Sequence, residues 1–210
     1  MKRYPVPAEE IRREMMVSNS RFIATLRPVF SVEEAKMFVA KVREEFADAS
    51  HNVPVYLVGY GSSVTAHCSD AGEPSGTAGQ PALAVLRGSG LGDVAVVVTR
   101  YFGGTKLGTG GLVRAYSAAV RMVVNAAPRA EKVLTHTVIL ALPYRLLERA
   151  RLLVAAQHGQ MLDEDFGADV TLTARFAVEH LDAFQSALSE LTNGAVQAEI
   201  VETSEVLMPL

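Results

Sequence analysis

The spacing of apolar residues changes along the first part of the chain, and it predicts a strand followed by a helix there. Residues 21–26 are mostly apolar and end before Pro28, which is typical of a strand. An amphipathic helix is predicted from Ser31 to about Phe46, because apolar side chains recur there at helical spacing. These side chains are Val32, Ala35, Phe38, Val39, Val42 and Phe46. Ser31 and Glu34 fit a capping box, in which Glu34 reaches back to the backbone of Ser31.

Five further elements are expected before residue 130. Residues 53–58 and 64–68 are predicted strands, joined through a glycine-containing turn. A short helix is expected over 77–86, because glycines interrupt the apolar pattern after it. Residues 93–99 form a nearly continuous β-branched run, which is typical of a strand buried on both faces. A helical period then resumes over 112–126.

From residue 135 the pattern predicts a second unit. Its strands are expected at 137–142, 160–165, 169–178 and 195–206, and its helices at 145–157 and 181–191. The order βαββαβ is that of the split βαβ, or ferredoxin-like, motif. Because the boundary falls in the stretch 128–134, the prediction is one domain over 1–134 and another over 135–210.

The net charge of −3 conceals an asymmetry between these two domains. Residues 1–134 carry 16 Lys and Arg against 12 Asp and Glu, a net charge of +4. Residues 135–210 carry 4 against 11, a net charge of −7. Such asymmetry predicts two units with different partners. The hydrophobic content of 49% excludes intrinsic disorder, which requires low hydrophobicity and high net charge.

Cysteine and histidine usage excludes several classes of protein. A single cysteine, Cys68, cannot form an internal disulfide, and no apolar run approaches the roughly 18 residues that a membrane span needs. We therefore expect a cytoplasmic protein that does not enter a membrane. His67 adjoins Cys68 in a predicted strand, so the two side chains point to opposite faces and Cys68 is expected to be an ordinary buried thiol. The histidines have no metal-ligand spacing, and neither a metal nor a cofactor is expected.

The first candidate motif is the stretch 70–81 (DAGEPSGTAGQP), in which glycines and prolines specify a fixed backbone path. Asp70 and Glu73 are candidates for an acid/base pair or for metal binding. The alternative is that the two carboxylates cap turns and the following helix, with Ser75 or Thr77 as its N-cap.

The second candidate motif is the stretch 99–116, where the buried strand runs into five glycines within nine residues and then into a helix. Glycines let backbone N–H groups approach an anion, and the helix N-terminus adds a favourable dipole. The spacing fits neither a P-loop nor a dinucleotide-binding fingerprint. The alternative is a tight structural turn with a solvated basic rim. The candidate anion- or RNA-binding residues are Arg100, Tyr101, Gly103, Gly104, Lys106, Gly108, Gly110, Gly111, Arg114 and Arg121.

Aromatic and basic residues are interleaved in this second motif. Arg114 and Arg121 lie seven residues apart and therefore share one face of the predicted helix. Rings among arginines suit stacking on unpaired bases, which makes Tyr101, Phe102 and Tyr116 candidates for that role. For any single ring, packing in the core is the alternative.

Three segments closely resemble the IMPACT/YigZ family: 20–24 (SRFIA), 70–81 and 97–116 (VVTRYFGGTKLGTGGLVRAY). The resemblance covers about residues 15–130, and the remainder resembles the companion domain of the bacterial members. It implies an α+β protein. The N-terminal domain is expected to adopt a ribosomal-protein-like two-layer α/β fold, shared with domain IV of elongation factor G. The C-terminal domain is expected to resemble the ferredoxin-like domains III and V of that factor.

For function, the resemblance implies a role in translation. Eukaryotic members regulate translation by competing for an activator of the kinase that senses amino-acid starvation, and bacterial members have a proposed nucleic-acid or ribosome-linked role. Three hypotheses stay open. The first is a non-enzymatic, translation-associated protein whose glycine loop binds RNA or the ribosome. The second is an enzyme for a small anionic substrate, with Asp70 and Glu73 as acid and base. The third is a protein-binding regulator of translation. The oligomeric state is left open.

Overall fold

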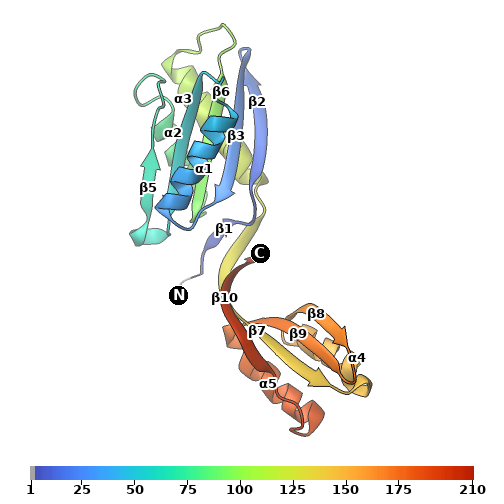
Figure 1. Cartoon of the computed structure of the whole chain (residues 1–210). Helices are drawn as coiled ribbons and strands as arrows, with labels where there is room; N and C mark the ends of the chain where they lie inside the picture. The colour runs from blue at the N-terminus through green and yellow to red at the C-terminus, as the bar shows by residue number, and fades with distance from the viewer. Residues whose placement is uncertain (1–2) are drawn as a thin grey trace. The chain divides into compact units, whose positions relative to one another are not determined.

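A computed structural model describes residues 3–210, the side chain of Pro209 excepted, and the chain divides into two compact units (Figure 1). The N-terminal unit extends to Glu131 and includes Met208–Leu210, whereas the second unit comprises Lys132–Leu207. Both units contain helices and strands, so the expected α+β class is confirmed. No helix within residues 3–210 is long and apolar enough to cross a membrane.

The N-terminal unit is built on one five-stranded sheet in which all neighbouring strands are antiparallel. The buried run of β-branched residues lies in the middle strand, as expected from its composition. The strand order is β2 (Ile11–Val17), β3 (Ser20–Pro28), β6 (Val94–Tyr101), β4 (His51–Val58) and β5 (Thr65–Cys68). The unit also contains a short strand, β1 (Pro5–Pro7), and a 3-10 turn, η1 (Gly61–Ser63).

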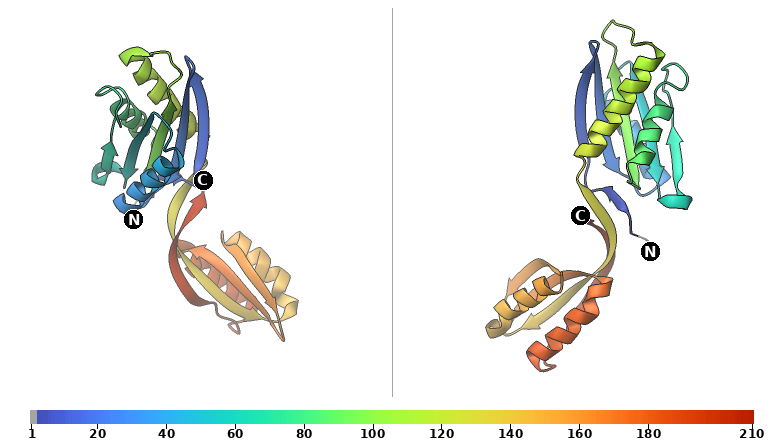
Figure 2. Two further views of the ribbon diagram at one scale, coloured as in Figure 1. Left: turned by 45° about the horizontal axis from the view of Figure 1, so that its top comes forward. Right: turned by 180° about the vertical axis from the view of Figure 1, so that it is seen from behind.

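Helices cover both faces of this sheet. Helix α1 (Val32–Glu45) packs on one face, and α2 (Gly79–Gly88) and α3 (Gly108–Ala126) pack on the other (Figures 1 and 2). The unit therefore has three layers, where two were expected. The physical reason is visible in β6, whose residues from Val94 to Arg100 are all buried, so that neither face of this strand is left to solvent.

The helix boundaries depart from the predicted ones in informative ways. Ser31 is the N-cap of α1, and its Oγ accepts from the backbone N–H of Glu34 at 3.0 Å. The Glu34 carboxylate accepts from the N–H of Phe30 at 2.8 Å, one residue before the expected partner. Helix α3 begins at Gly108 rather than at residue 112, so three glycines of the predicted loop lie in its first turn.

The second unit has the predicted βαββαβ order. Its elements are β7 (Arg129–Leu142), η2 (Tyr144–Leu146), α4 (Leu147–Ala156), β8 (Gln160–Phe166), β9 (Val170–Ala177), α5 (Val178–Thr192) and β10 (Glu199–Pro209). The sheet order is β10-β7-β9-β8, and the helices bury an apolar cluster that includes Leu140, Leu172 and Phe184. Strand β7 begins eight residues before the expected position, and its first three residues pair with β1.

Candidate functional site

A buried carboxylate joins the two candidate motifs in the N-terminal unit. The side chain of Glu73 is 3% exposed, and its Oε1 accepts from Nη1 of Arg100 at 2.7 Å and from the hydroxyl of Tyr116 at 2.7 Å. Glu73 comes from the loop before α2, Arg100 from the end of β6 and Tyr116 from α3. Three segments that are far apart in the sequence are thus held together at one end of the sheet.

Arg100 is part of this buried network rather than of the surface. Its side chain is 6% exposed, and Nη2 donates to Oγ of Ser20 at 3.3 Å. The guanidinium carbon lies 5.5 Å from the ring centroids of both Phe22 and Phe102. The expectation that Arg100 contacts phosphate is therefore corrected. Arg100 occupies the central strand, opposite Phe22 of β3, where the sheet and Glu73 enclose it.

Tyr116 is also a core residue, in agreement with the alternative stated above for a single ring. It is fully buried, and its ring meets the edge of Phe22 at a centroid distance of 5.3 Å. Burial, followed by the hydrogen bond to Glu73, raises the pKa of the Tyr116 hydroxyl far above its usual range. The hydroxyl therefore remains a proton donor to Glu73 throughout the range of physiological pH.

His51 and Asp70 fix the loop that carries Glu73. The Nδ1 atom of His51 lies 2.9 Å from the carbonyl oxygen of Ala71, and its Nε2 lies 3.8 Å from Oε2 of Glu73. The Asp70 carboxylate accepts three backbone N–H bonds, from Gly76 at 2.8 Å, Ala78 at 3.0 Å and Gly79 at 2.8 Å. Asp70 therefore caps the start of α2 from a distance, and neither Ser75 nor Thr77 is its N-cap.

These three bonds determine how Asp70 titrates. Burial alone would raise the pKa of the carboxyl, but the N–H groups of Gly76, Gly79 and Ala78 outweigh it and hold the pKa below its ordinary value of 3.8. The stabilisation is therefore fully present above about pH 4 and is lost as the pH falls through the lower pKa of the folded state.

We predict that Asp70→Asn lowers the free energy of unfolding by about 1 kcal/mol near neutral pH, the usual contribution of a helix cap. The difference from the wild type should shrink below about pH 4, because protonation removes the same charge from the wild type. Urea unfolding at a series of pH values measures both quantities. A difference that stays constant down to about pH 2 would show that the Asp70 charge does not stabilise the loop.

The two carboxylates of the acid/base hypothesis take part in the internal hydrogen bonding of the N-terminal unit. Both carboxylates are occupied by internal donors, Asp70 by backbone amides and Glu73 by Arg100 and Tyr116. Within residues 3–210 no group of three or more His, Cys, Asp or Glu side chains is arranged to hold a metal ion. The pKa of the Cys68 thiol is raised by burial and by the Asp70 charge, which is the opposite of what an activated nucleophile requires.

The glycine loop, defined here as residues 102–111, extends from this buried network into solvent. Gly103 anchors it, because its N–H donates to Oγ of Ser20 at 3.3 Å and its backbone packs directly on Asn19. A Cβ atom at Gly103 would lie only 1.9 Å from the carbonyl oxygen of Asn19. Beyond this anchor, Gly104 and Lys106 are exposed, and Phe102 is 49% exposed.

The start of α3 has the properties of an anion-binding helix terminus. Leu107, at the N-cap, makes no side-chain capping bond, and the first turn contains no acidic residue. The amides of the first turn and the positive end of the helix dipole therefore lack a negative partner on this helix. Gly110 has an ordinary helical backbone and nothing within 4 Å of the position a Cβ would take, so packing does not require a glycine there.

Three of the predicted cations lie in the glycine loop and along α3. Lys106, Arg114 and Arg121 are exposed, and none of them forms an ion pair with any part of the chain that the structure describes. Tyr101, by contrast, is tied down, because its hydroxyl donates to Asp48 at 2.7 Å. Phe102 is the aromatic side chain that is left for stacking in this loop.

Ser20 is the site residue whose role the sequence did not indicate. It is fully buried, and its Oγ accepts from both Arg100 and the amide of Gly103. The sequence signals were its place in the family-like segment 20–24 and a small hydroxyl residue just before an apolar strand. Those signals do not identify a partner, since both partners are more than 79 residues away in the chain.

Comparison with known protein families places this fold and site in a defined class. The family model of the Impact N-terminal domain matches residues 18–124, which contain the buried network and the glycine loop. A second family model, a domain of unknown function (DUF1949), matches residues 140–195 in the second unit. The chain belongs to the IMPACT family, as its motifs predicted.

Full-length relatives support this assignment. An IMPACT family member from Haemophilus influenzae is 34% identical over 98% of this chain and 100% of its own length. The IMPACT family member YigZ from Escherichia coli is 34% identical over 96% of this chain and 100% of its own length. A crystal structure of a hypothetical protein, also 34% identical, superposes with a TM-score of 0.61 and covers 96% of this chain and 98% of that one.

Proposed function

We propose that this chain is a translation-associated regulatory protein, without catalytic activity, that acts in the cytoplasm by binding RNA through the glycine loop. The RNA would be free or part of the ribosome. The observation that carries the proposal is an uncapped helix N-terminus followed by exposed cations, Lys106 in the glycine loop and Arg114 and Arg121 along α3, which have no ionic partner among residues 3–210. Membership of the IMPACT family supports the link to translation through the resemblance described above.

The chemistry of this surface favours a nucleic-acid backbone over a small metabolite. Phosphates are recognised by backbone N–H groups at a helix start and by Lys and Arg side chains, and these groups carry no sequence information. Residues 94–130 include four basic residues besides Arg100 and no acid. The exposed ring of Phe102 adds a stacking surface for an unpaired base beside these charges.

The proposal predicts a salt-dependent interaction that depends on three named charges. Wild-type protein should bind labelled poly(U) RNA with a slope of log K against log salt of about −2, as expected for three neutralised phosphates on a single strand. The triple variant Lys106→Gln, Arg114→Gln and Arg121→Gln should bind about tenfold or more weakly at low salt, with a slope near zero. Fluorescence anisotropy over a salt series measures both.

A matched control is available on the same unit. The triple variant Lys36→Gln, Arg43→Gln and Arg87→Gln removes the same charge from exposed positions outside the glycine loop. Its RNA affinity should equal that of the wild type. Equal loss in both triple variants would indicate a non-specific effect of net charge, and no RNA or ribosome binding at low salt would refute the proposal. Cosedimentation with ribosomes, with and without nuclease, separates RNA binding from the protein-binding hypothesis.

A further inference from the structure

Strand β5 forms an open edge of the N-terminal sheet. It is the last strand in the order β2-β3-β6-β4-β5, and among residues 3–210 it pairs only with β4. Both ribbon views show no element beside its outer side (Figures 1 and 2). An open edge presents unpaired N–H and C=O groups that another chain can use.

The pairing with β4 fixes which backbone groups point outward. The N–H of Ser69 donates to the carbonyl oxygen of Pro54 at 3.2 Å, so these two residues face each other as a hydrogen-bonded pair. Hydrogen-bonded and non-hydrogen-bonded pairs alternate along an antiparallel ladder. Cys68 and Ala66 are opposite Val55 and Leu57 in the non-hydrogen-bonded pairs. Their N–H and C=O groups therefore point away from the sheet.

A groove lies on each side of this edge. On the α2 side, a cavity of about 480 Å³ is lined by Ala66, His67, Cys68, Gln80, Leu83, Ala84 and Arg87. On the α1 side, a cavity of about 530 Å³ is lined by apolar surface and carries two cations. Its lining residues are Lys36, Val39, Ala40, Arg43, Pro54, Tyr56 and His67.

The charges of the two grooves are all of one sign at neutral pH. Among the residues that the structure describes, no carboxylate lines either groove. Lys36, Arg43 and Arg87 are exposed, and within residues 3–210 none of them forms an ion pair. The α1 groove is the more basic, with two cations against one in the α2 groove.

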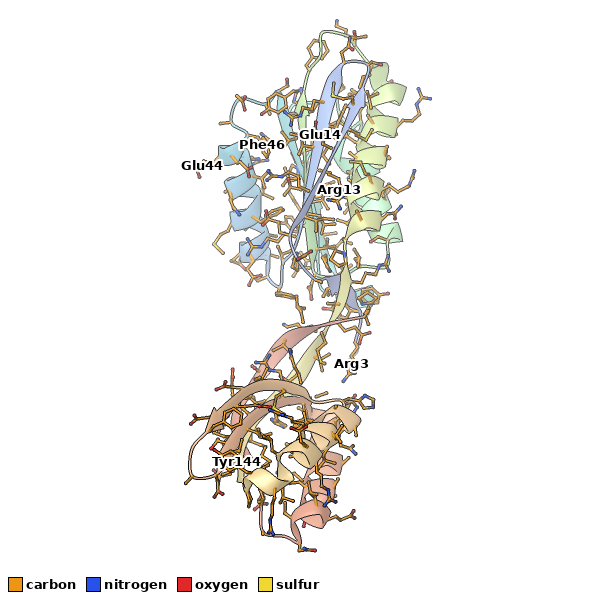
Figure 3. All side chains as sticks on the ribbon, turned by 90° about the vertical axis from the view of Figure 1, so that its right-hand side faces the viewer. Arg3, Arg13, Glu14, Glu44, Phe46 and Tyr144 are labelled. Atoms are coloured by element: carbon orange, nitrogen blue, oxygen red, sulfur yellow. The ribbon has the colours of Figure 1, made fainter. Side chains whose placement is uncertain are left out.

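The opposite edge of the same sheet is protected. Strand β2 carries the charged side chains of Arg13 and Glu14 (Figure 3). Nη1 of Arg13 donates to the backbone carbonyl oxygen of Arg12 at 2.8 Å, and Glu14 pairs with Arg21 at 2.7 Å. Charged side chains that cover the backbone are a common means of blocking an edge. The four residues of β5 include no Lys, Arg, Asp, Glu or Pro.

We propose that the β5 edge binds an extended acidic segment of a partner protein by strand addition. Successive side chains of an added strand point to opposite faces, so alternate residues enter the two grooves. Apolar residues of the segment pack on the exposed Ala84, and its carboxylates face Lys36 and Arg43. The outward groups of Ala66 and Cys68 supply the main-chain hydrogen bonds. This inference is independent of the proposed RNA binding, which uses other residues.

A peptide-binding experiment tests this inference on the full chain. The probe is a fluorescein-labelled synthetic peptide in which valine alternates with glutamate, and the reference probe replaces each glutamate by lysine. We expect saturable binding of the acidic peptide that weakens with salt, and at least about tenfold weaker binding of the basic peptide. Equal binding of the two peptides, or no binding of either, would overturn the inference. The inference would also be overturned if the chain self-associates and thereby prevents peptide binding, because a second copy of the chain would then occupy the β5 edge.

Two variants test the two halves of the interaction. Ala66→Pro removes an outward N–H but no hydrogen bond to β4, and it should weaken peptide binding about tenfold. The surface variant Lys36→Gln with Arg43→Gln should have a comparable effect without touching the strand. The triple variant at Lys106, Arg114 and Arg121 is the control and should bind the peptide like the wild type. Unchanged peptide affinity in the Lys36 and Arg43 variant refutes the assignment of the grooves, whether or not Ala66→Pro folds.

Discussion

Glu73→Ala should lower the free energy of unfolding by about 3–5 kcal/mol, the cost of leaving a buried charge without its partner. The guanidinium of Arg100 would then lie buried under the loop without the carboxylate that pairs with it. The buried Nε of Arg100 already has no hydrogen-bond partner in the structure. The hydroxyl of Tyr116 would lose its acceptor in the same step. Urea unfolding followed by circular dichroism measures the change.

A double-mutant cycle separates the ion pair from general damage to the loop. Combining Glu73→Ala with Arg100→Met should restore part of the lost stability, because an apolar replacement removes the uncompensated charge. Glu14→Ala is the matched control, since Glu14 and Arg21 form a pair of the same chemistry at 2.7 Å with both side chains nearly half exposed. That variant should unfold almost like the wild type. A strictly additive cycle would show that Glu73 and Arg100 do not stabilise the fold as a pair.

The contrast between these two pairs shows what the sequence could and could not reveal. Periodicity located the five α-helices and all the strands except β1 and β2, because each element buries one face and the apolar positions record it. It could not show that Arg100 is buried, because a charged side chain at the end of a strand is usually exposed. Arg100 is enclosed by the neighbouring strand β3 and by the loop that carries Glu73, and both are distant from it in the sequence.

The start of α3 was predicted at residue 112 rather than at Gly108 for a related reason. Gly108, Gly110 and Gly111 have no side chains that could display a helical period, so the sequence pattern begins only at Leu112. The three-layer arrangement and the open edge at β5 were also not predictable, because strand order is set by contacts between distant segments rather than by local pattern. The glycine-rich and proline-rich motifs were recognisable because their residue types restrict the backbone directly.

Gly103→Ala is the second substitution with a large expected effect, and Gly110→Ala is its matched partner in the same loop. A Cβ at Gly103 would lie 1.9 Å from the oxygen and 2.1 Å from the carbonyl carbon of Asn19, and these backbone atoms cannot rotate away. The glycine loop must therefore separate from the turn before β3, at a cost of about 3 kcal/mol or more. At Gly110 the added Cβ meets nothing within 4 Å.

Gly110→Ala should consequently leave the fold intact and add up to about 1 kcal/mol of stability, since alanine favours a helix over glycine. Under the proposed function it should still weaken RNA binding severalfold, because the added methyl group stands where a phosphate would approach the first turn of α3. Thermal unfolding and RNA anisotropy on the same two variants distinguish the roles: Gly103 as an anchor that the fold requires, and Gly110 as a position kept open for a ligand. Full stability in Gly103→Ala would refute the anchor, and unchanged RNA affinity in Gly110→Ala would remove the helix terminus from the proposed binding surface.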